Sequence, residues 1–158
     1  MSQDFELMTK EGLERLWVEK KKVITDLEQA QARMGETSGG GGGWHENNFF
    51  EFLEEEIHRL RSKLNTINTR LERAKVVDTT NEPGDLVQFG SRVELDINEE
   101  ITKYIILGEA DSDIRLNIIS YKSPIAQAII GKPQGAISEL ELPNKEMVVI
   151  KIVKISKQ

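Results

Sequence analysis

The sequence predicts an α+β protein, in which an N-terminal antiparallel two-helix coiled-coil hairpin precedes a smaller domain of strands and one short helix. Three observations support this. Apolar residues of the first half follow the alternating three-and-four spacing of a helical seam, a glycine-rich segment interrupts that pattern, and the second half has strand-like apolar alternation. We place the hairpin at residues 1–79 and the second domain at residues 80–158.

Two stretches of the first half have heptad patterns. The first helix is expected to begin near Thr9, whose hydroxyl is suited to an N-cap. The second is expected to begin at Asn48, which with Glu51 resembles a capping box. The heptad rows are Leu13, Lys20, Leu27, Met34 and Leu16, Val23, Ala30 in the first helix, and Phe50, Ile57, Leu64, Leu71 and Leu53, Leu60, Ile67, Ala74 in the second.

Residues 35–49 form the predicted tip of the hairpin. The run Gly39 to Gly43 disfavours a helix by up to about 1 kcal/mol per residue relative to alanine, so the first helix should end near residues 34–36. Two seams joined by such a breaker predict an antiparallel hairpin roughly 40 Å long.

The second half has a different period. A turn-forming cluster at residues 81–85 precedes it, and a short helix at residues 125–130 begins after Ser123 as N-cap and Pro124 and ends at Gly131. A mostly antiparallel sheet with this helix is therefore expected. The predicted strands are Leu86–Phe89, Arg92–Ile97, Thr102–Leu107, Ala136–Leu142 and Met147–Ile155.

Composition excludes several classes of protein. There is no cysteine, so a disulfide scaffold, a thiolate zinc site and a cysteine nucleophile are excluded. The sequence has neither an 18-residue apolar run nor a signal-peptide pattern, which predicts a cytoplasmic protein without a membrane partner. The net charge is −6, and neither half has the basic excess of an autonomous nucleic-acid binder. No complete set of nucleophile, base and metal ligands is present, so we do not expect an autonomous enzyme.

Three stretches resemble the Gre family of bacterial transcript cleavage factors. They are Met8–Leu16, Leu71–Asp78 and Ile119–Lys132, and the third is the most specific. The resemblance implies an FKBP-like C-terminal domain that docks at the rim of the RNA polymerase secondary channel, while the hairpin of the monomeric factor enters the channel. It further implies that acidic tip residues help to hold the second Mg²⁺ of the polymerase active site, which cleaves the 3′ end of backtracked RNA. The resemblance also implies that the factor needs no cofactor of its own and contacts the nascent RNA only indirectly.

The tip departs from the family pattern, in which Asp-Leu-x-Glu-Asn-Ala-Glu-Tyr is common. Gly43 stands at the first carboxylate, Phe49 at the third acidic position and Phe50 at the tyrosine, whereas Glu46 and Asn47 are kept. The resemblance thus assigns metal binding to Glu46, with Asn47 beside it. Because Mg²⁺ is usually held by one or two carboxylates, the loss of one predicts reduced cleavage.

We expect Trp44, His45 and Phe50 to contact the partner, and two of them leave alternatives open. His45 is either a proton acceptor or metal ligand, or a solvated loop histidine. Trp44 is either an interface anchor or base-stacking platform, or a side chain folded over Phe49 or Phe52.

In the second domain, Ser123 and Pro124 match the polymerase-docking loop of the family. Lys122 precedes them, where family members often have an uncharged or acidic residue, which predicts a weaker contact with a basic partner surface.

These features favour a Gre-type elongation factor that acts on backtracked or arrested complexes by promoting transcript cleavage. The alternative is a non-cleaving regulator or inhibitor that occupies the secondary channel and competes with cleavage factors. A coiled-coil scaffold is a third hypothesis, but it does not explain residues 123–132.

Overall fold

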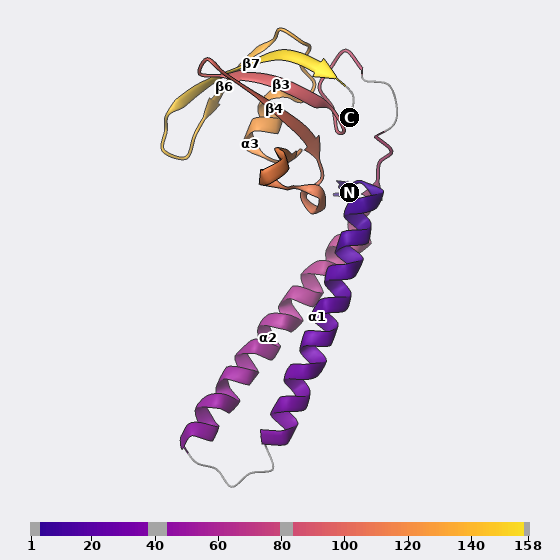
Figure 1. Cartoon of the computed structure of the whole chain (residues 1–158), viewed down its shortest axis with the longest axis vertical. Helices are drawn as coiled ribbons and strands as arrows, with labels where there is room; N and C mark the ends of the chain where they lie inside the picture. Colours follow the sequence, from indigo (N-terminus) through magenta and orange to yellow (C-terminus); the bar gives the residue numbers. More distant parts are fainter. Residues whose placement is uncertain (1–3, 38–43, 80–83, 157–158) are drawn as a thin grey trace. The chain divides into compact units, whose positions relative to one another are not determined.

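The computed structural model describes residues 4–37, 44–79 and 84–156, without the side chains of Thr37 and of residues 44–47 (Figure 1). The chain forms two compact units, one of Met1–Asp4 and Glu14–Arg73 and the other of Phe5–Leu13 and Ala74–Gln158. The units are not consecutive halves of the chain, because the segment 5–13 belongs to the second unit together with everything after Arg73.

The first unit is the predicted antiparallel hairpin, formed by helices α1 (Lys10–Thr37) and α2 (Trp44–Arg73), which run side by side in Figure 1. In each helix three residues of one heptad row are buried between the helices, whereas the other row is half-buried except for the buried Ile57. Lys63 and Glu19 form an ion pair across the helices, with 2.8 Å between Nζ and Oε1. The buried seam consists of Leu16, Val23, Ala30, Leu53, Ile57, Leu60 and Ile67.

The helix ends test three sequence predictions. The Thr9 hydroxyl accepts a hydrogen bond from the backbone N–H of Gly12 at 3.0 Å, which confirms the predicted N-cap of α1. The helix ends at Thr37, close to the expected position. The capping box at Asn48 was wrong, because α2 already begins at Trp44 and Asn48 lies inside the helix. None of the residues 44–47 is glycine or proline, so the backbone there has no helix breaker.

The second unit contains a five-stranded sheet in the order β5-β4-β3-β7-β6. Every neighbouring pair is antiparallel except β4 and β5, so the predicted mostly antiparallel α+β fold is confirmed. The strands are β3 (Arg92–Ile97), β4 (Glu100–Leu107), β5 (Ile118–Ser120), β6 (Ile137–Glu141) and β7 (Met147–Ser156).

Two local predictions for the sheet fail. Residues 86–89 form no strand and contribute only an isolated bridge between Leu86 and Pro133. Strand β5 was missed, because its three residues are too short to produce an apolar period. It is held by parallel pairing with β4, as between Ile119 and Ile106.

Helix α3 (Pro124–Ile129) packs on one face of this sheet (Figure 1). Its Ala126 and Ile129 are fully buried, and they join the apolar residues that point inward from the strands. The core thereby fixes where the segment before α3 lies. The buried core residues are Val87, Val93, Leu95, Ile106, Ala126, Ile129, Val148, Ile150 and Ile152.

A small parallel sheet links the start of the chain to the segment after α2. Strand β1 (Glu6–Met8) pairs with β2 (Ala74–Val76), and the backbone N–H of Val77 donates to the carbonyl of Met8 at 2.9 Å. The sequence analysis missed both strands, since three residues without a turn between them carry no local signal.

Candidate functional site

The predicted site at the tip of the hairpin lies at the edge of the described part of the chain. Trp44, His45, Glu46 and Asn47 form the first turn of α2, but their side chains lie outside the described part of the structure, as does all of Gly43. The roles assigned to these residues therefore stay predictions.

The described side chains of the tip begin at Asn48. Phe50 is half-buried on the seam side of α2, whereas Asn48 is exposed. Phe49 and Phe52 are 44% and 57% exposed. The start of α2 thus presents two aromatic rings outside the seam.

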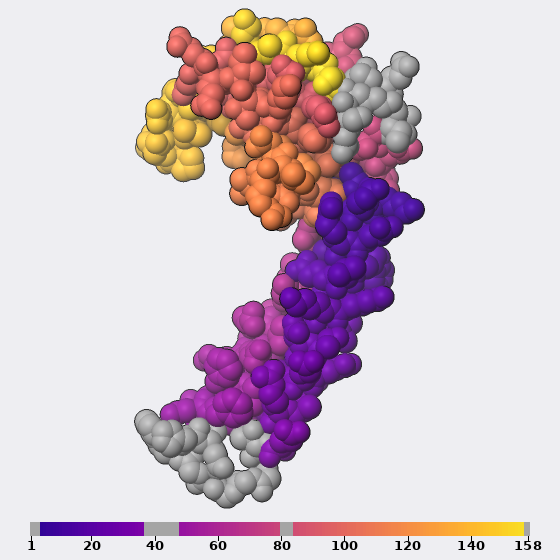
Figure 2. Space-filling view, in the orientation of Figure 1, coloured from indigo at the N-terminus to yellow at the C-terminus, as the bar shows by residue number. Residues whose placement is uncertain are grey.

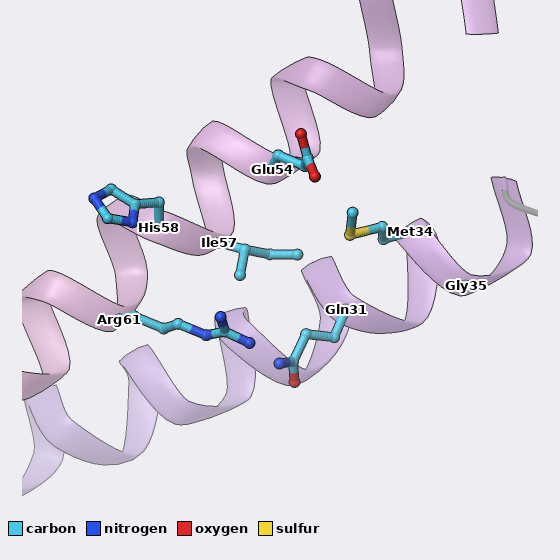
Figure 3. A pocket seen from close by; sticks show the side chains of 7 residues that line it. All are labelled: Gln31, Met34, Gly35, Glu54, Ile57, His58 and Arg61. Carbon is cyan, nitrogen blue, oxygen red and sulfur yellow. The ribbon is translucent and has the colours of Figure 1, made fainter. Parts of the chain in front are cut away.

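A cleft of about 620 Å³ lies between α1 and α2 beside this exposed region. Figure 3 shows Met34 and Ile57 projecting into it from opposite helices, while Arg61 extends toward Gln31. Gly35 of α1 also lines the cleft. Among the residues whose side chains the structure describes, the cleft contains the heptad residues Met34 and Ile57 but none of the predicted site residues. Its other lining residues are Glu54 and His58.

The predicted docking turn connects β5 to α3. The Ser123 hydroxyl accepts from the N–H of Ala126 at 3.3 Å and so caps α3, while its own N–H donates to the carbonyl of Ser120 at 2.8 Å. The side-chain amide of Gln127 donates to the carbonyl of Tyr121 at 2.7 Å. These bonds fix the backbone of the turn, and the predicted capping by Ser123 is confirmed.

The fixed turn presents two of its side chains to solvent. Pro124 is exposed at the first helical position. Lys122 is exposed as well, with its ammonium nitrogen 5.7 Å from the centroid of the Tyr121 ring. The three predicted docking residues Lys122, Ser123 and Pro124 therefore share one short, rigid segment.

A groove of about 550 Å³ adjoins this turn, and sequence reasoning missed it. Ser123 and Pro124 form one side, and the β6–β7 connection around Pro143 forms the other. In Figure 2 it lies in the hollow between the yellow β6–β7 turn and the orange segment that carries α3. The lining is mostly apolar and comprises Ile119, Ser123, Pro124, Ile125, Leu140, Glu141, Leu142, Pro143 and Lys145.

A buried polar cluster holds the N-terminal segment within the second unit. The carboxylate of Asp111 accepts from the N–H of Thr9 at 3.0 Å and also from the Thr9 hydroxyl. The N–H of Leu7 donates to the hydroxyl of Tyr121 at 3.4 Å, next to the docking turn. Sequence reasoning identified Thr9 but not Asp111, since nothing local relates residues 102 positions apart.

Electrostatic and metal-binding features are modest in the ranges 4–37, 44–79 and 84–156. Asp113 raises the pKa of Arg115, first through their side-chain hydrogen bond and then through its charge. In the same ranges no three histidine or carboxylate side chains are grouped as a metal site. None of the helices described there is long and apolar enough to cross a membrane.

The known proteins that are similar to this chain belong to one family. The family model "Transcription elongation factor, GreA/GreB, C-term" matches residues 82–157. Transcription elongation factor GreA of a Nitratiruptor species is 33% identical over 145 residues, covering 90% of this chain and 83% of the relative. The GreA of Rickettsia bellii (strain OSU 85-389) is 33% identical over 155 residues, covering 94% and 91%.

A solved structure is also similar over most of its length. The GreA factor homolog 1 (Gfh1) protein of Thermus thermophilus is 21% identical, with a TM-score of 0.46, and the alignment covers 96% of this chain and 98% of the other.

Proposed function

Because this chain belongs to the GreA/GreB family of transcription elongation factors, we propose that it binds RNA polymerase and acts on backtracked or arrested elongation complexes. The second unit docks at the rim of the secondary channel, and the hairpin enters the channel. The polymerase then cleaves the 3′ end of its own transcript, and the factor supplies ligands and positioning. The factor itself is not an enzyme.

The observation that carries this proposal is the hairpin. Helices of 28 and 30 residues, packed along a buried apolar seam, rise roughly 42–45 Å at 1.5 Å per residue. Such a hairpin buries one stripe per helix and has no enclosed site of its own. Its geometry suits the delivery of a few tip residues into a narrow channel.

The docking turn supports the role of the second unit. Its backbone is fixed by the Ser123 cap, so little conformational entropy is lost when a partner covers Pro124 and the adjoining groove. Lys122 is exposed in the same segment, and we expect it to weaken the contact if the polymerase surface there is basic.

The tip chemistry rests on Glu46. Mg²⁺ prefers oxygen ligands and is usually bound by one or two carboxylates plus water, so the Glu46 carboxylate, with the Asn47 amide beside it, fits as a supplementary ligand. The metal belongs to the polymerase, where it would activate water for phosphodiester hydrolysis. With glycine at position 43, one carboxylate of the family pattern is absent, and cleavage should be slow.

The second candidate function is a regulator that occupies the channel without promoting cleavage. Gly43 and Phe49 favour it, since both stand where the family pattern has carboxylates, and the Phe49 ring is 44% exposed. Such a protein would block the channel and compete with active cleavage factors.

A transcript cleavage assay separates the two functions. Stalled, backtracked elongation complexes are mixed with the full chain, and shortening of the labelled RNA is followed with time. We expect slow cleavage that is lost in Glu46→Ala and kept in the control Glu72→Ala, which changes an exposed carboxylate near the other end of α2. Absence of cleavage, combined with inhibition of an added cleavage factor, would instead establish the regulator. Cleavage unchanged in Glu46→Ala would contradict the role of that residue.

A further inference from the structure

We propose that strand β6 (Ile137–Glu141) is an open sheet edge that binds an extended protein segment of alternating basic and apolar residues. The segment would add a strand to the sheet through backbone hydrogen bonds. We call the N–H and C=O groups of Ile137, Glu139 and Glu141 the β6 edge. The inference goes beyond the proposed function, because neither the hairpin nor the docking turn forms this edge.

The pairing of β6 with β7 determines which backbone groups point outward. In an antiparallel ladder, residues that bond the neighbouring strand alternate with residues whose N–H and C=O point away from it. The carbonyl of Ala136 accepts from the N–H of Ile152 in β7 at 2.9 Å, so residues 138 and 140 also bond β7. The groups of the β6 edge therefore point away from the sheet. No strand of this sheet lies beyond β6, and among the described residues none outside the ladder hydrogen-bonds the β6 edge.

The opposite edge of the sheet is partly closed by the chain itself. Asp113 and Ile118 exchange two backbone hydrogen bonds, at 3.0 and 2.9 Å, and so cover the first residue of β5. An uncovered row of donors and acceptors is where an extended segment can add a strand. In the five-stranded sheet, as far as the structure describes it, β6 is therefore the more open of the two edges.

The charges on the outer face of the sheet select basic residues in the segment. Glu139 and Glu141 lie directly opposite Val149 and Met147 of β7, so neither glutamate has a cation as its cross-strand partner. Both are exposed, and in the described part of the chain neither forms an ion pair. A second copy of this chain, paired through its own β6, would set glutamate near glutamate, and like charges on opposing strands are destabilising.

The cations near β6 do not cancel this negative charge. Lys151 of β7 lies directly opposite Asp96 of β3 and is only a diagonal neighbour of Glu139, about 7 Å away. Lys132 is on the inner side of β6, where its ammonium donates to the hydroxyl of the buried Ser138 at 2.8 Å. The outer face beside the β6 edge therefore keeps the charge of its two glutamates.

The inner side of β6 selects apolar residues. Leu140 and Leu142 line the groove beside the docking turn, as does Ile125, so this groove reaches the C-terminal end of β6. Its charged lining residues, Glu141 and Lys145, have opposite signs, so the groove itself favours neither charge. Since side chains alternate between the two faces of a strand, basic and apolar residues would alternate in the bound segment.

Binding of a short synthetic peptide of alternating lysine and valine to the full chain tests the inference. Amide hydrogen exchange, followed residue by residue by NMR, should slow about tenfold or more at Ile137, Glu139 and Glu141 when the peptide is bound. The amides of Ser138 and Leu140 already bond β7, so their exchange should change little. A peptide of alternating glutamate and valine is the matched control, and it should bind at least about tenfold more weakly.

Two variants at one position separate the backbone bond from the charge. Glu139→Gln removes the carboxylate and keeps the N–H, whereas Glu139→Pro removes both. Proline is tolerated on an edge strand where the N–H points to solvent, so the ladder with β7 is kept. Both variants should bind the lysine peptide more weakly than the unaltered chain, with the larger loss in Glu139→Pro. The double variant Glu139→Lys/Glu141→Lys keeps the backbone groups and should lose the preference for the lysine peptide.

Each outcome supports or overturns one part of the inference. Protection that is absent from the β6 edge, or spread equally over the odd and even residues of β6, would overturn strand addition. Equal binding of the two peptides would overturn the selection of a basic segment, and equal affinity of Glu139→Gln and Glu139→Pro would overturn the role of the backbone. None of these measurements involves polymerase, so the transcript cleavage assay tests the proposed function separately.

Discussion

The side-chain hydroxyl of Thr9 donates a hydrogen bond to the carboxylate of Asp111, 102 residues further along the chain. That carboxylate also accepts from the N–H of Thr9, while the Thr9 oxygen accepts from the N–H of Gly12. Both residues are buried, with 6% of Thr9 and 3% of Asp111 exposed. One polar cluster thus caps α1 and holds its first turn to the 3₁₀ turn Glu109–Asp111.

Asp111→Ala should destabilise the second unit. The substitution leaves the N–H and hydroxyl of Thr9 without this acceptor in a buried place, which costs about 1–3 kcal/mol for each unsatisfied group. Urea unfolding monitored by circular dichroism measures the loss. Asp111→Asn retains one acceptor oxygen and should lose less, so equal midpoints for all three proteins would contradict the role of the cluster.

Gly12→Ala should also destabilise the fold. An added Cβ would lie only 2.7 Å from Cγ of Asp111, whose side chain is held by Thr9 and cannot easily move aside. Overpacking of this kind costs about 1–3 kcal/mol, which exceeds the gain in helix propensity of up to about 1 kcal/mol. A lower melting temperature is expected, and an unchanged or higher one would show that Asp111 can shift.

Gly35→Ala is the matched substitution, and it should raise the stability of the protein where Gly12→Ala lowers it. Gly35 lies in the same helix, but apart from its chain neighbours and the nearby backbone of that helix no heavy atom is within 4 Å of the added Cβ. The helix should therefore gain up to about 1 kcal/mol in stability. Helical signal during thermal unfolding reports the change, and destabilisation would contradict the open surroundings of this position.

Ser123→Ala should cost about 1 kcal/mol of stability, because α3 loses the side-chain acceptor for the N–H of Ala126. The looser docking turn should also lower the affinity for polymerase. Ser123→Asp keeps a capping oxygen and serves as the stability control, so both effects should be smaller in it. Polymerase affinity unaffected by Ser123→Ala would separate this turn from docking.

Gly43→Asp should raise the rate of transcript cleavage. The substitution restores a carboxylate where the family pattern has one, and a second oxygen ligand strengthens the hold on Mg²⁺. Gly43→Asn supplies an uncharged side chain of nearly the same shape and is the control. If both variants cleave at the original rate, the glycine is not what limits the reaction.

The sequence by itself determined the features that depend on near neighbours. The heptad rows of α1 and α2, the Thr9 and Ser123 caps and four of the strands were predictable, because periodicity and capping involve residues within a few positions. The family resemblance rested on short motifs and was confirmed by the relatives.

Only the tertiary structure decided which distant residues meet. The pairing of β1 with β2, the contact between Thr9 and Asp111 and the groove beside Pro124 join segments far apart in the chain. The physical reason is that a local pattern records what one segment favours, whereas long-range contacts depend on how the buried core positions several segments at once.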